Sequence, residues 1–459
     1  MTKRVLLTLL TLAVVACLVL ICITSLGSLL LAANRLHASP PEPTSTIIPP
    51  SQLPTPAEPE NLPAHIAAQM DTIQTQVIQI RGLTPLTHVP RNVLTSTELR
   101  KKVEEDFFAD YPHEKARDDA ILLSTLGLLP LDYDLYNLLL ELYSEQVAGY
   151  YDTQTKKMYV VQGESFGGME RMTYAHEFTH ALQDQYYDLE KGLKLNANDC
   201  EKAGEYCAAV TALIEGDAVL TAQSWFSRYG SRTDRQEVQD FMSEFNSPVF
   251  DSAPLFLQKD LLFPYREGME FAATLFDQQG QAAIDQAFSR PPVSTEQILH
   301  PYQYPDDTPD DIASPRLDTV LGKKWRVVEQ NALGEWYTYL VLAYGWREQA
   351  RMPLGAARKA AAGWEGDTYT LLHNSETGKV IFVLRSIWQT PNDAHEFWEA
   401  LVKYGSDRWE TAPIVKNDQL AAWQDTSQGY VSISINTMET RWIIAPDQTT
   451  ADLVLAAME

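Results

Sequence analysis

Positive charge is scarce in this chain of 459 residues. It carries 36 lysines and arginines against 61 aspartates and glutamates, which gives a formal net charge of −25 at pH 7. Nucleic-acid phosphates and anionic lipid headgroups are bound through clusters of basic side chains, and an acidic body repels both. The composition therefore argues against nucleic acid as a partner and against adhesion to an anionic lipid surface. It suits solubility outside the cell.

Cysteine is also rare, with four residues in the whole chain. Cys17 and Cys22 fall in an apolar stretch near the start, so only Cys200 and Cys207 belong to the rest of the chain. Two thiols are too few for a zinc site built from cysteine alone. Their spacing could close a small loop in an oxidising compartment, and the alternative is a pair of buried free thiols.

Charged residues are absent from residues 5–33, which are mostly apolar. At about 1.5 Å of rise per residue, such a run can cross the hydrocarbon layer of a membrane as a tilted helix, and it is too long for the core of a signal peptide. Lys3 and Arg4 favour a cytoplasmic position for residues 1–4. We therefore expect a single-pass anchor in the cell membrane and an extracytoplasmic body. A competing interpretation is a lipoprotein signal processed at Cys17.

Residues 34–63 have the composition of a linker. Nine prolines fall within residues 39–63, with serine, threonine and glutamate between them. Such a segment cannot bury a core and favours an extended polyproline conformation. We expect it to hold the folded body away from the membrane, and a disordered tether would serve nearly the same purpose.

Residues 173–182 contain two histidines four positions apart, His176 and His180, with Glu177 directly after the first. In a helix both imidazoles project from one face and can hold one ion. Zinc is the ion expected for neutral imidazoles, and a carboxylate beside it can take a proton from the water it binds. The alternative is a core helix with two satisfied histidines. Burying these groups without a partner is costly, so the pattern favours a zinc site.

A catalytic zinc site needs a third protein ligand and a position open to water. Residues 208–222 read as a buried helix that is interrupted by Glu215, Gly216 and Asp217. We predict Glu215 as the third ligand. Gly216 would remove a side chain where another backbone or an ion comes close. Asp217 either orients a ligand imidazole or is a solvated charge.

The arrangement of His176, Glu177, His180 and Glu215 resembles the gluzincin class of zinc metallopeptidases. The metzincin class is excluded, because Gln183 occupies a position where that class has glycine. The gluzincin resemblance implies peptide-bond hydrolysis, with the two histidines and Glu215 as zinc ligands and Glu177 as the general base. The resemblance extends over residues 146–220. In this range the chain is similar to bacterial membrane-associated or secreted members of the class.

The resemblance departs from the thermolysin type at one position. There an acidic residue follows the glutamate ligand by four positions, and this chain has Val219 instead. The resemblance also implies a tyrosine or histidine that stabilises the oxyanion from the C-terminal side of the site. Tyr265 and His300 are the candidates for that role, and each has a structural role as its alternative.

The fold predicted from these patterns is α+β. Residues 64–145 read as helices that pack over the catalytic core, and residues 146–315 as a zincin-like catalytic domain with a small sheet. A hairpin of residues 147–151 and 157–161 precedes the zinc helix. Residues 316–459 alternate strand-like and helical stretches and form a C-terminal α+β domain.

The sequence therefore predicts a membrane-anchored, extracytoplasmic zinc metallopeptidase that acts on a peptide or protein substrate. The rival hypothesis is a non-catalytic binding or scaffold protein in which zinc only ties helices together. Glu177 separates the two, because a structural zinc site has no need of a base. The oligomeric state and the cleavage specificity do not follow from the sequence.

Overall fold

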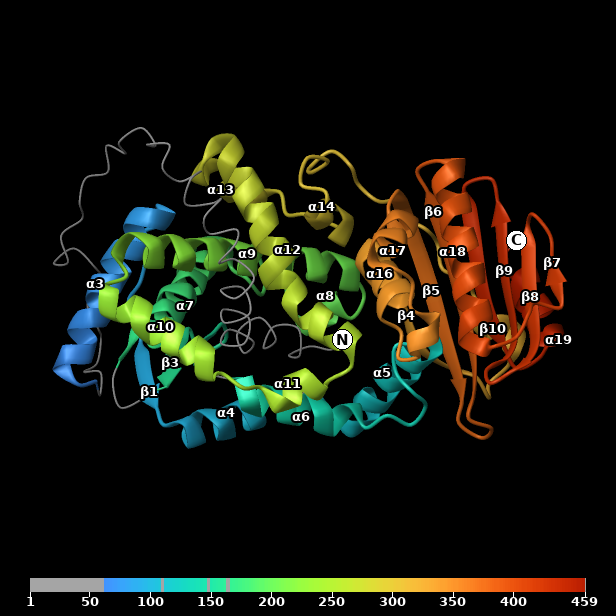
Figure 1. Ribbon diagram of the computed structural model, residues 1–459, viewed down its shortest axis with the longest axis horizontal. Helices are drawn as coiled ribbons and strands as arrows, with labels where there is room; N and C mark the ends of the chain where they lie inside the picture. Colours follow the sequence, from blue (N-terminus) through green and yellow to red (C-terminus); the bar gives the residue numbers. More distant parts are fainter. Residues whose placement is uncertain (1–61, 109–110, 147–148, 162–165, 459) are drawn as a thin grey trace.

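The computed structural model describes residues 62–108, 111–146, 149–161 and 166–458. The predicted membrane anchor lies outside these residues, as does nearly all of the predicted linker. No helix within the described ranges is long and apolar enough to cross a membrane. The described chain is α+β: a helical region with a small sheet comes first, and a domain built on a larger sheet follows (Figure 1).

The helical region confirms the helices predicted between residues 64 and 145, where apolar side chains recur with the period of a helix. Residues 227–251, which are mostly polar and read as a loop or an exposed helix, contain the exposed helix α10. The helices of this region are α3 (Ala64–Arg81), α4 (Ser96–Phe108), α5 (His113–Leu126), α6 (Leu135–Gln146), α7 (Gly168–Tyr187), α8 (Ala197–Cys200), α9 (Gly204–Tyr229), α10 (Arg232–Glu244), α11 (Pro248–Ser252), α12 (Leu255–Gln279), α13 (Gln281–Ser289) and α14 (Thr295–Leu299).

A three-stranded sheet packs beside α7. It consists of β1 (Arg91–Leu94), β2 (Gly149–Asp152) and β3 (Lys157–Val161), in the order β1-β3-β2. The antiparallel pair of β2 and β3 confirms the predicted hairpin, whereas β1, which runs parallel to β3, was not predicted. Within the described residues β2 pairs with β3 only, so β2 is an edge strand of this sheet, and it contacts α7.

Helices α9 and α12 cross with their backbones in direct contact. A Cβ atom added to Gly216 would lie 2.0 Å from the carbonyl oxygen of Gly268, and one added to Gly268 would lie 2.1 Å from the carbonyl oxygen of Ala212. Only glycine at both positions permits this approach. The predicted close approach at Gly216 is confirmed, and α12 is the partner.

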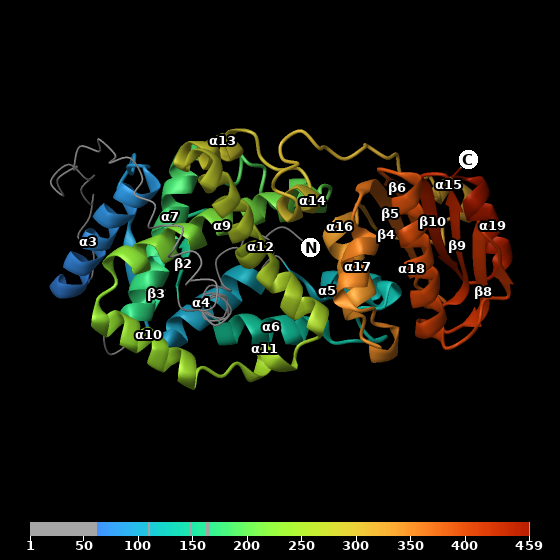
Figure 2. The ribbon, with the colours of Figure 1, turned by 45° about the horizontal axis from the view of Figure 1, so that its top comes forward.

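The C-terminal domain is a seven-stranded antiparallel sheet in the order β4-β5-β6-β10-β9-β8-β7. Figure 2 shows α16, α17 and α18 on one face and α15 and α19 on the other. The strand-like runs of the sequence are residues 368–373, 379–384, 430–435 and 441–444, and they lie in β5, β6, β9 and β10. No such run indicated β4, β7 or β8. The elements are α15 (Asp318–Leu321), β4 (Arg326–Asn331), α16 (Gly334–Tyr344), α17 (Leu354–Ala361), β5 (Trp364–Asn374), β6 (Lys379–Trp388), α18 (Pro391–Trp409), β7 (Val415–Lys416), β8 (Leu420–Thr426), β9 (Gly429–Asn436), β10 (Glu439–Ala445) and α19 (Gln448–Ala456).

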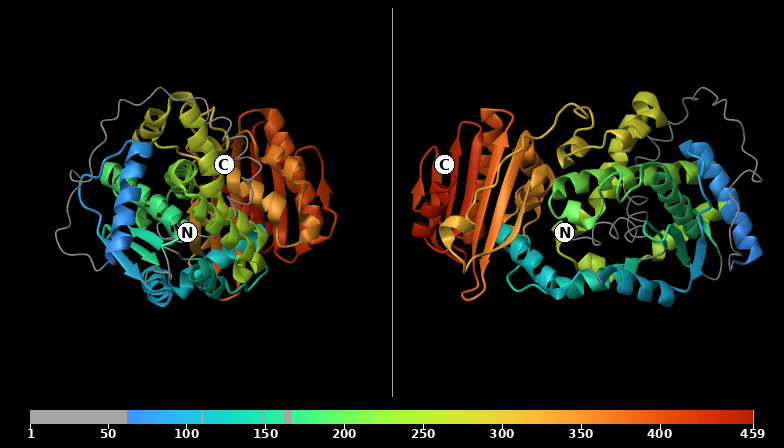
Figure 3. Two further views of the ribbon diagram at one scale, coloured as in Figure 1. Left: turned by 60° about the vertical axis from the view of Figure 1, so that its left-hand side comes forward. Right: turned by 180° about the vertical axis from the view of Figure 1, so that it is seen from behind.

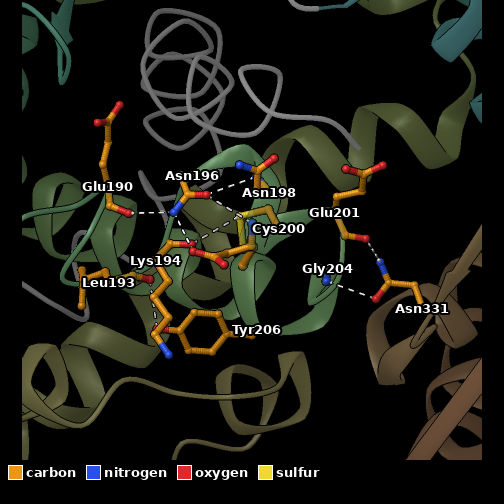
Figure 4. Close-up of a disulfide and its surroundings, with 12 residues drawn as sticks. Glu190, Leu193, Lys194, Asn196, Asn198, Cys200, Glu201, Gly204, Tyr206 and Asn331 are labelled. Carbon is orange, nitrogen blue, oxygen red and sulfur yellow. Dashed lines mark hydrogen bonds between the residues drawn. A yellow bond between two sulfur atoms is a disulfide. The ribbon is translucent and has the colours of Figure 1, made fainter. Parts of the chain in front are cut away.

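The helical region and the C-terminal domain lie end to end along the long axis of the molecule (Figure 3). A disulfide between Cys200 and Cys207 closes the turn from α8 to α9 beside this junction. This confirms the predicted small disulfide loop over a pair of buried free thiols. Asn331, at the end of β4, accepts a hydrogen bond of 3.2 Å from the Gly204 amide and donates one of 3.3 Å to the Glu201 carbonyl (Figure 4). The disulfide therefore holds a loop that binds the C-terminal domain.

The N-terminal ends of α9, α14 and α16 meet at the same junction. Glu205, in the first turn of α9, accepts hydrogen bonds from the Thr295 amide at 2.6 Å and the Thr295 hydroxyl at 2.5 Å. The Thr295 hydroxyl in turn accepts one of 3.2 Å from the Trp336 amide. Burial raises the pKa of Glu205 to about 8, although the hydrogen bonds from Thr295 oppose the shift.

We expect Glu205→Gln to stabilise the protein at pH 8 by roughly 2 to 4 kcal/mol, since one pKa unit corresponds to about 1.4 kcal/mol. The folded-state pKa of Glu205 lies above its ordinary value, so the unfolded chain releases this proton first as pH rises. The free energy of unfolding therefore falls between about pH 4.5 and pH 8 through this group. Denaturant unfolding of both proteins between pH 4 and pH 9 measures the difference, which should vanish at the acidic end.

Glu439→Gln serves as the control, with the opposite sign. Burial raises the pKa of Glu439, but its ion pairs with Arg385 and Arg441 outweigh burial and lower it. This substitution should therefore destabilise the protein at neutral pH, and the difference should fade as pH falls through the lowered pKa. A Glu205→Gln variant with the same pH slope as the wild type would contradict the assignment of a buried, protonated Glu205.

Candidate metal centre

Helix α7 carries both histidines, and it is buried along most of its length. At its start, the Glu170 carboxylate accepts a hydrogen bond of 3.1 Å from the Gly167 amide, which is free of intrahelical partners at a helix end. His176 and His180 are 0% and 2% exposed, and their Nε2 atoms are 2.9 Å apart. The helix thus holds the two imidazoles on one face, as predicted.

Helix α9 brings Glu215 to the same point. Its Oε2 lies 3.1 Å from Nε2 of His176 and 3.5 Å from Nε2 of His180. The ligand atoms of the three residues lie within 4.8 Å of one another, and all three side chains are buried. The structure therefore forms one group, from two helices, that could hold a metal ion.

The donor set fits zinc. In a tetrahedral site with bonds of about 2.0 to 2.1 Å, neighbouring ligand atoms are about 3.3 Å apart, close to the separations found here. Two imidazoles and a carboxylate are costly to bury unless a cation is shared among them. Oε1 of Glu215 also has no hydrogen-bond partner among the described residues. His176, His180 and Glu215 would hold the ion.

The pKa shifts of the group indicate a buried ion pair between His180 and Glu215. Burial lowers the pKa of His176, and His180 lowers it further. For His180, burial disfavours the charged form, but Glu215 outweighs burial and raises the pKa to about 9. The pKa of Glu215 is lowered, because the charge on His180 outweighs its burial. Binding of a metal ion would therefore displace a proton from His180.

Glu177 lies beside the group without joining it. Its Oε2 accepts a hydrogen bond of 2.8 Å from the Tyr151 amide of β2. Its Oε1 is buried and lacks a hydrogen-bond partner within the described part of the chain. Burial raises the pKa of Glu177 to about 8. The edge strand β2 thus holds one oxygen of this carboxylate and leaves the other available.

Asp217 is fully buried, so the prediction of a solvated charge is wrong. The prediction that it orients a ligand imidazole also needs correction, because Gln183 makes that contact. The Gln183 side chain accepts a hydrogen bond from Nδ1 of His180 at 2.9 Å and donates one to Asp217 at 2.8 Å. Asp217 therefore reaches the imidazole only through Gln183.

The two candidates for oxyanion stabilisation are placed differently. The ring of Tyr265, on α12, is buried and its centroid lies 6.4 Å from that of His176. His300 instead follows α14 at the junction, where its Nε2 lies 3.0 Å from both carboxylate oxygens of Glu335. The structure thus brings Tyr265 to the metal group and pairs His300 with the C-terminal domain.

Comparison with known proteins finds a family match in the C-terminal domain. Residues 324–455 match the family model of a domain of unknown function, DUF8575. No curated protein and no solved structure matches the chain. The matched segment covers β4 to α19 and leaves the metal group outside.

A cavity of about 180 Å³ lies between the helical region and the segment similar to DUF8575. Tyr265 and Thr211 line it from the side of the metal group, Phe256 contributes to its apolar wall, and Tyr369 belongs to the matched segment. Thr211 precedes Glu215 by one helical turn, and its hydroxyl has no hydrogen-bond partner in the described ranges. The cavity thus extends from the neighbourhood of the metal group to the C-terminal domain.

Three residues at the site escaped prediction: Gln183, Arg81 and Tyr151. Gln183 had one usable signal, because a residue three positions after His180 lies on the same helix face. Arg81 lies on α3 and forms an ion pair of 2.8 Å with Asp217, far away in sequence. Tyr151 acts through its backbone amide, which no residue type reveals.

Proposed function

We propose that this protein is a membrane-anchored, extracytoplasmic zinc metallopeptidase. The observation that carries the proposal is the convergence of His176, His180 and Glu215, with Glu177 beside them and outside the ligand set. This donor set belongs to catalytic zinc sites that keep one position for water. A buried carboxylate with an available oxygen next to such a site is the group that hydrolysis requires.

A bound zinc ion would act as a Lewis acid that lowers the pKa of water and polarises the peptide carbonyl. Glu177 takes the proton of the attacking water and passes it to the leaving amine. The amide of Tyr151 fixes the orientation of this carboxylate. Tyr265 is the favoured donor to the oxyanion, since its ring lies near His176, whereas His300 is held by Glu335.

The edge strand β2 supports a peptide as the substrate. Its Tyr151 amide points to Glu177, so this strand runs beside the proposed base. An extended peptide that adds to a sheet edge is bound through its backbone, with little dependence on its side chains. A peptide bound along β2 would pass Glu177.

The proposed location follows from the apolar residues 5–33 and from the disulfide. A disulfide between Cys200 and Cys207 is typical of an oxidising compartment. We propose a single membrane anchor with the body outside the cytoplasm, and a lipid anchor at Cys17 is the alternative. The intact mass of the N-terminal fragment separates the two, because lipid attached to Cys17 increases it.

Deep burial of the metal group favours a second candidate function. All three ligand side chains are at most 2% exposed, as in a structural zinc site that ties helices together. In that case the protein would be a non-catalytic binding or scaffold protein. The position of Glu177 favours the peptidase, because a structural site has no use for a buried base.

We expect the full-length protein in detergent to cleave members of a pooled peptide library, to lose this activity with a chelator and to regain it with added zinc. The physical reason is that His176, His180 and Glu215 can activate water only through a shared ion. Mass spectrometry of the pool measures cleavage. Activity that persists in chelator would contradict the mechanism, and tight zinc binding without any cleavage would favour the scaffold.

A further inference from the structure

A buried chain of polar side chains links three helices to the metal group. Nε of Arg81, on α3, donates to Oδ2 of Asp217, on α9, at 2.8 Å. The same oxygen accepts a hydrogen bond of 2.8 Å from Nε2 of Gln183, on α7, whose Oε1 faces Nδ1 of His180 at 2.9 Å. Each of the four side chains is at most 2% exposed.

The direction of every hydrogen bond in this chain is set by chemistry. A guanidinium only donates and stays protonated, and an ionised carboxylate only accepts. The amide nitrogen of Gln183 must therefore face Asp217, and its carbonyl oxygen must face His180. An acceptor at that point requires a proton on Nδ1 of His180, which leaves the lone pair of Nε2 for the metal ion.

A flip of the Gln183 amide is opposed at a second contact. Nε2 of Gln183 also donates to the backbone carbonyl of Ile214 at 3.0 Å. In the flipped amide, the carbonyl oxygen would face two acceptors, the Asp217 carboxylate and the Ile214 carbonyl. Both contacts are buried, so neither acceptor could turn to solvent.

The far end of the chain is anchored as well. Nη1 of Arg81 pairs with Asp285 of α13 at 2.7 Å, and Asp285 accepts a hydrogen bond of 3.0 Å from the Tyr187 hydroxyl. The guanidinium is thus held between α9 and α13. His176 has no comparable support, since its Nδ1 lacks a hydrogen-bond partner among the described residues.

We propose that Arg81, Asp217 and Gln183 are positioning residues that fix the tautomer and orientation of His180, so that α3 helps to set the metal affinity of the site. This inference rests on the metal site of the proposed function, but not on its peptidase activity. The three residues act through hydrogen-bond direction, and the charge of Asp217 serves only to keep its oxygen an acceptor.

The test is the zinc affinity of the full-length protein, measured by competition with a chromophoric chelator. Gln183→Met keeps the length of the side chain but can neither accept from His180 nor donate to Asp217. Loss of such a support typically weakens metal binding about 10- to 100-fold, and we expect that range here. The unfolding temperature of the metal-free variant, recorded in parallel, reports any general loss of structure.

Asp217→Asn tests whether Asp217 acts through hydrogen-bond direction or through its charge. Its side-chain oxygen can still accept from both Arg81 and Gln183, and its amide would take the place of Oδ1, which has no hydrogen-bond partner in the described part of the chain. We expect this variant to keep its zinc affinity within about threefold, because every hydrogen-bond direction is retained. Equal losses in the two variants would show that Asp217 acts on the ion through its charge, and would overturn the inference.

The double variant Arg81→Met/Asp217→Asn tests the chain if Gln183→Met fails to fold. The Arg81→Met change removes the guanidinium that donates to residue 217, and the Asp217→Asn change avoids an unpaired carboxylate there. Zinc affinity should fall at least about fivefold. Wild-type affinity in Gln183→Met, or in the double variant, would refute the positioning role and leave the metal site intact. A wild-type protein that binds no zinc would refute the metal site itself.

Discussion

Replacing Glu177 by Gln is expected to reduce peptide hydrolysis by a factor of about 10² to 10⁴, the usual contribution of a general base. Gln is nearly isosteric and can still accept the Tyr151 amide hydrogen bond, but it cannot take a proton from water. Because Glu177 lies outside the group of His176, His180 and Glu215, zinc affinity should change little. Initial rates on a cleaved peptide and chelator competition measure the two quantities.

Glu170→Gln, on the same helix, is the control for this substitution. Its carboxylate accepts the Gly167 amide hydrogen bond at the start of α7, and glutamine can serve equally as an acceptor there. This variant should retain full hydrolysis. Hydrolysis at the wild-type rate in Glu177→Gln would remove Glu177 from the mechanism.

The second large effect is expected for Gly216→Ala, which should lower the free energy of unfolding by about 3 kcal/mol or more. The added Cβ would lie 2.0 Å from the carbonyl oxygen of Gly268, and this backbone can move only if α12 shifts as a whole. Overpacking of a core typically costs about 1 to 3 kcal/mol. We expect a cost at or above the upper end of this range, because the clash is with a backbone atom, which yields less readily than a side chain. Glu215 precedes Gly216 directly, so zinc affinity should fall as well.

Gly355→Ala provides a matched control for the crossing of α9 and α12. Gly355 is an exposed residue of α17, and a Cβ added there meets no atom of the described chain within 4 Å. The same substitution should therefore stabilise the protein by up to about 1 kcal/mol, because alanine has the higher helix propensity. Denaturant unfolding compares the variants, and a Gly216→Ala protein as stable as the wild type would contradict the close crossing.

The pairing of Glu177 with β2 also bears on the choice between enzyme and scaffold. A structural site would be complete with His176, His180 and Glu215, and a further buried carboxylate would only add a cost. Here the Tyr151 amide offsets part of that cost and leaves Oε1 of Glu177 without a hydrogen-bond partner in the described residues. The cost of burying the Glu177 carboxylate is explained if its Oε1 contacts water during hydrolysis.

Local patterns were sufficient for several features of this protein. The spacing of His176 and His180 determines that they share a helix face. The strand-like runs of residues 147–151 and 157–161, separated by a polar turn, predict the hairpin of β2 and β3. These features depend on neighbours within a few residues, so their geometry follows from the backbone period. The close approach at Gly216 was also predictable, because a glycine inside a buried helix is costly without such a reason.

Tertiary structure alone decided which distant groups meet. The packing of α3, α7 and α9 joins Arg81 to Asp217 and Asp217 to Gln183. The end-to-end arrangement of the helical region and the C-terminal domain pairs His300 with Glu335. The ring of Tyr265 lies near that of His176. Helix crossings depend on the packing of whole surfaces, and no local period encodes them. The sequence by itself thus determined the helix that carries the two histidines, and the packing of helices decided what surrounds them.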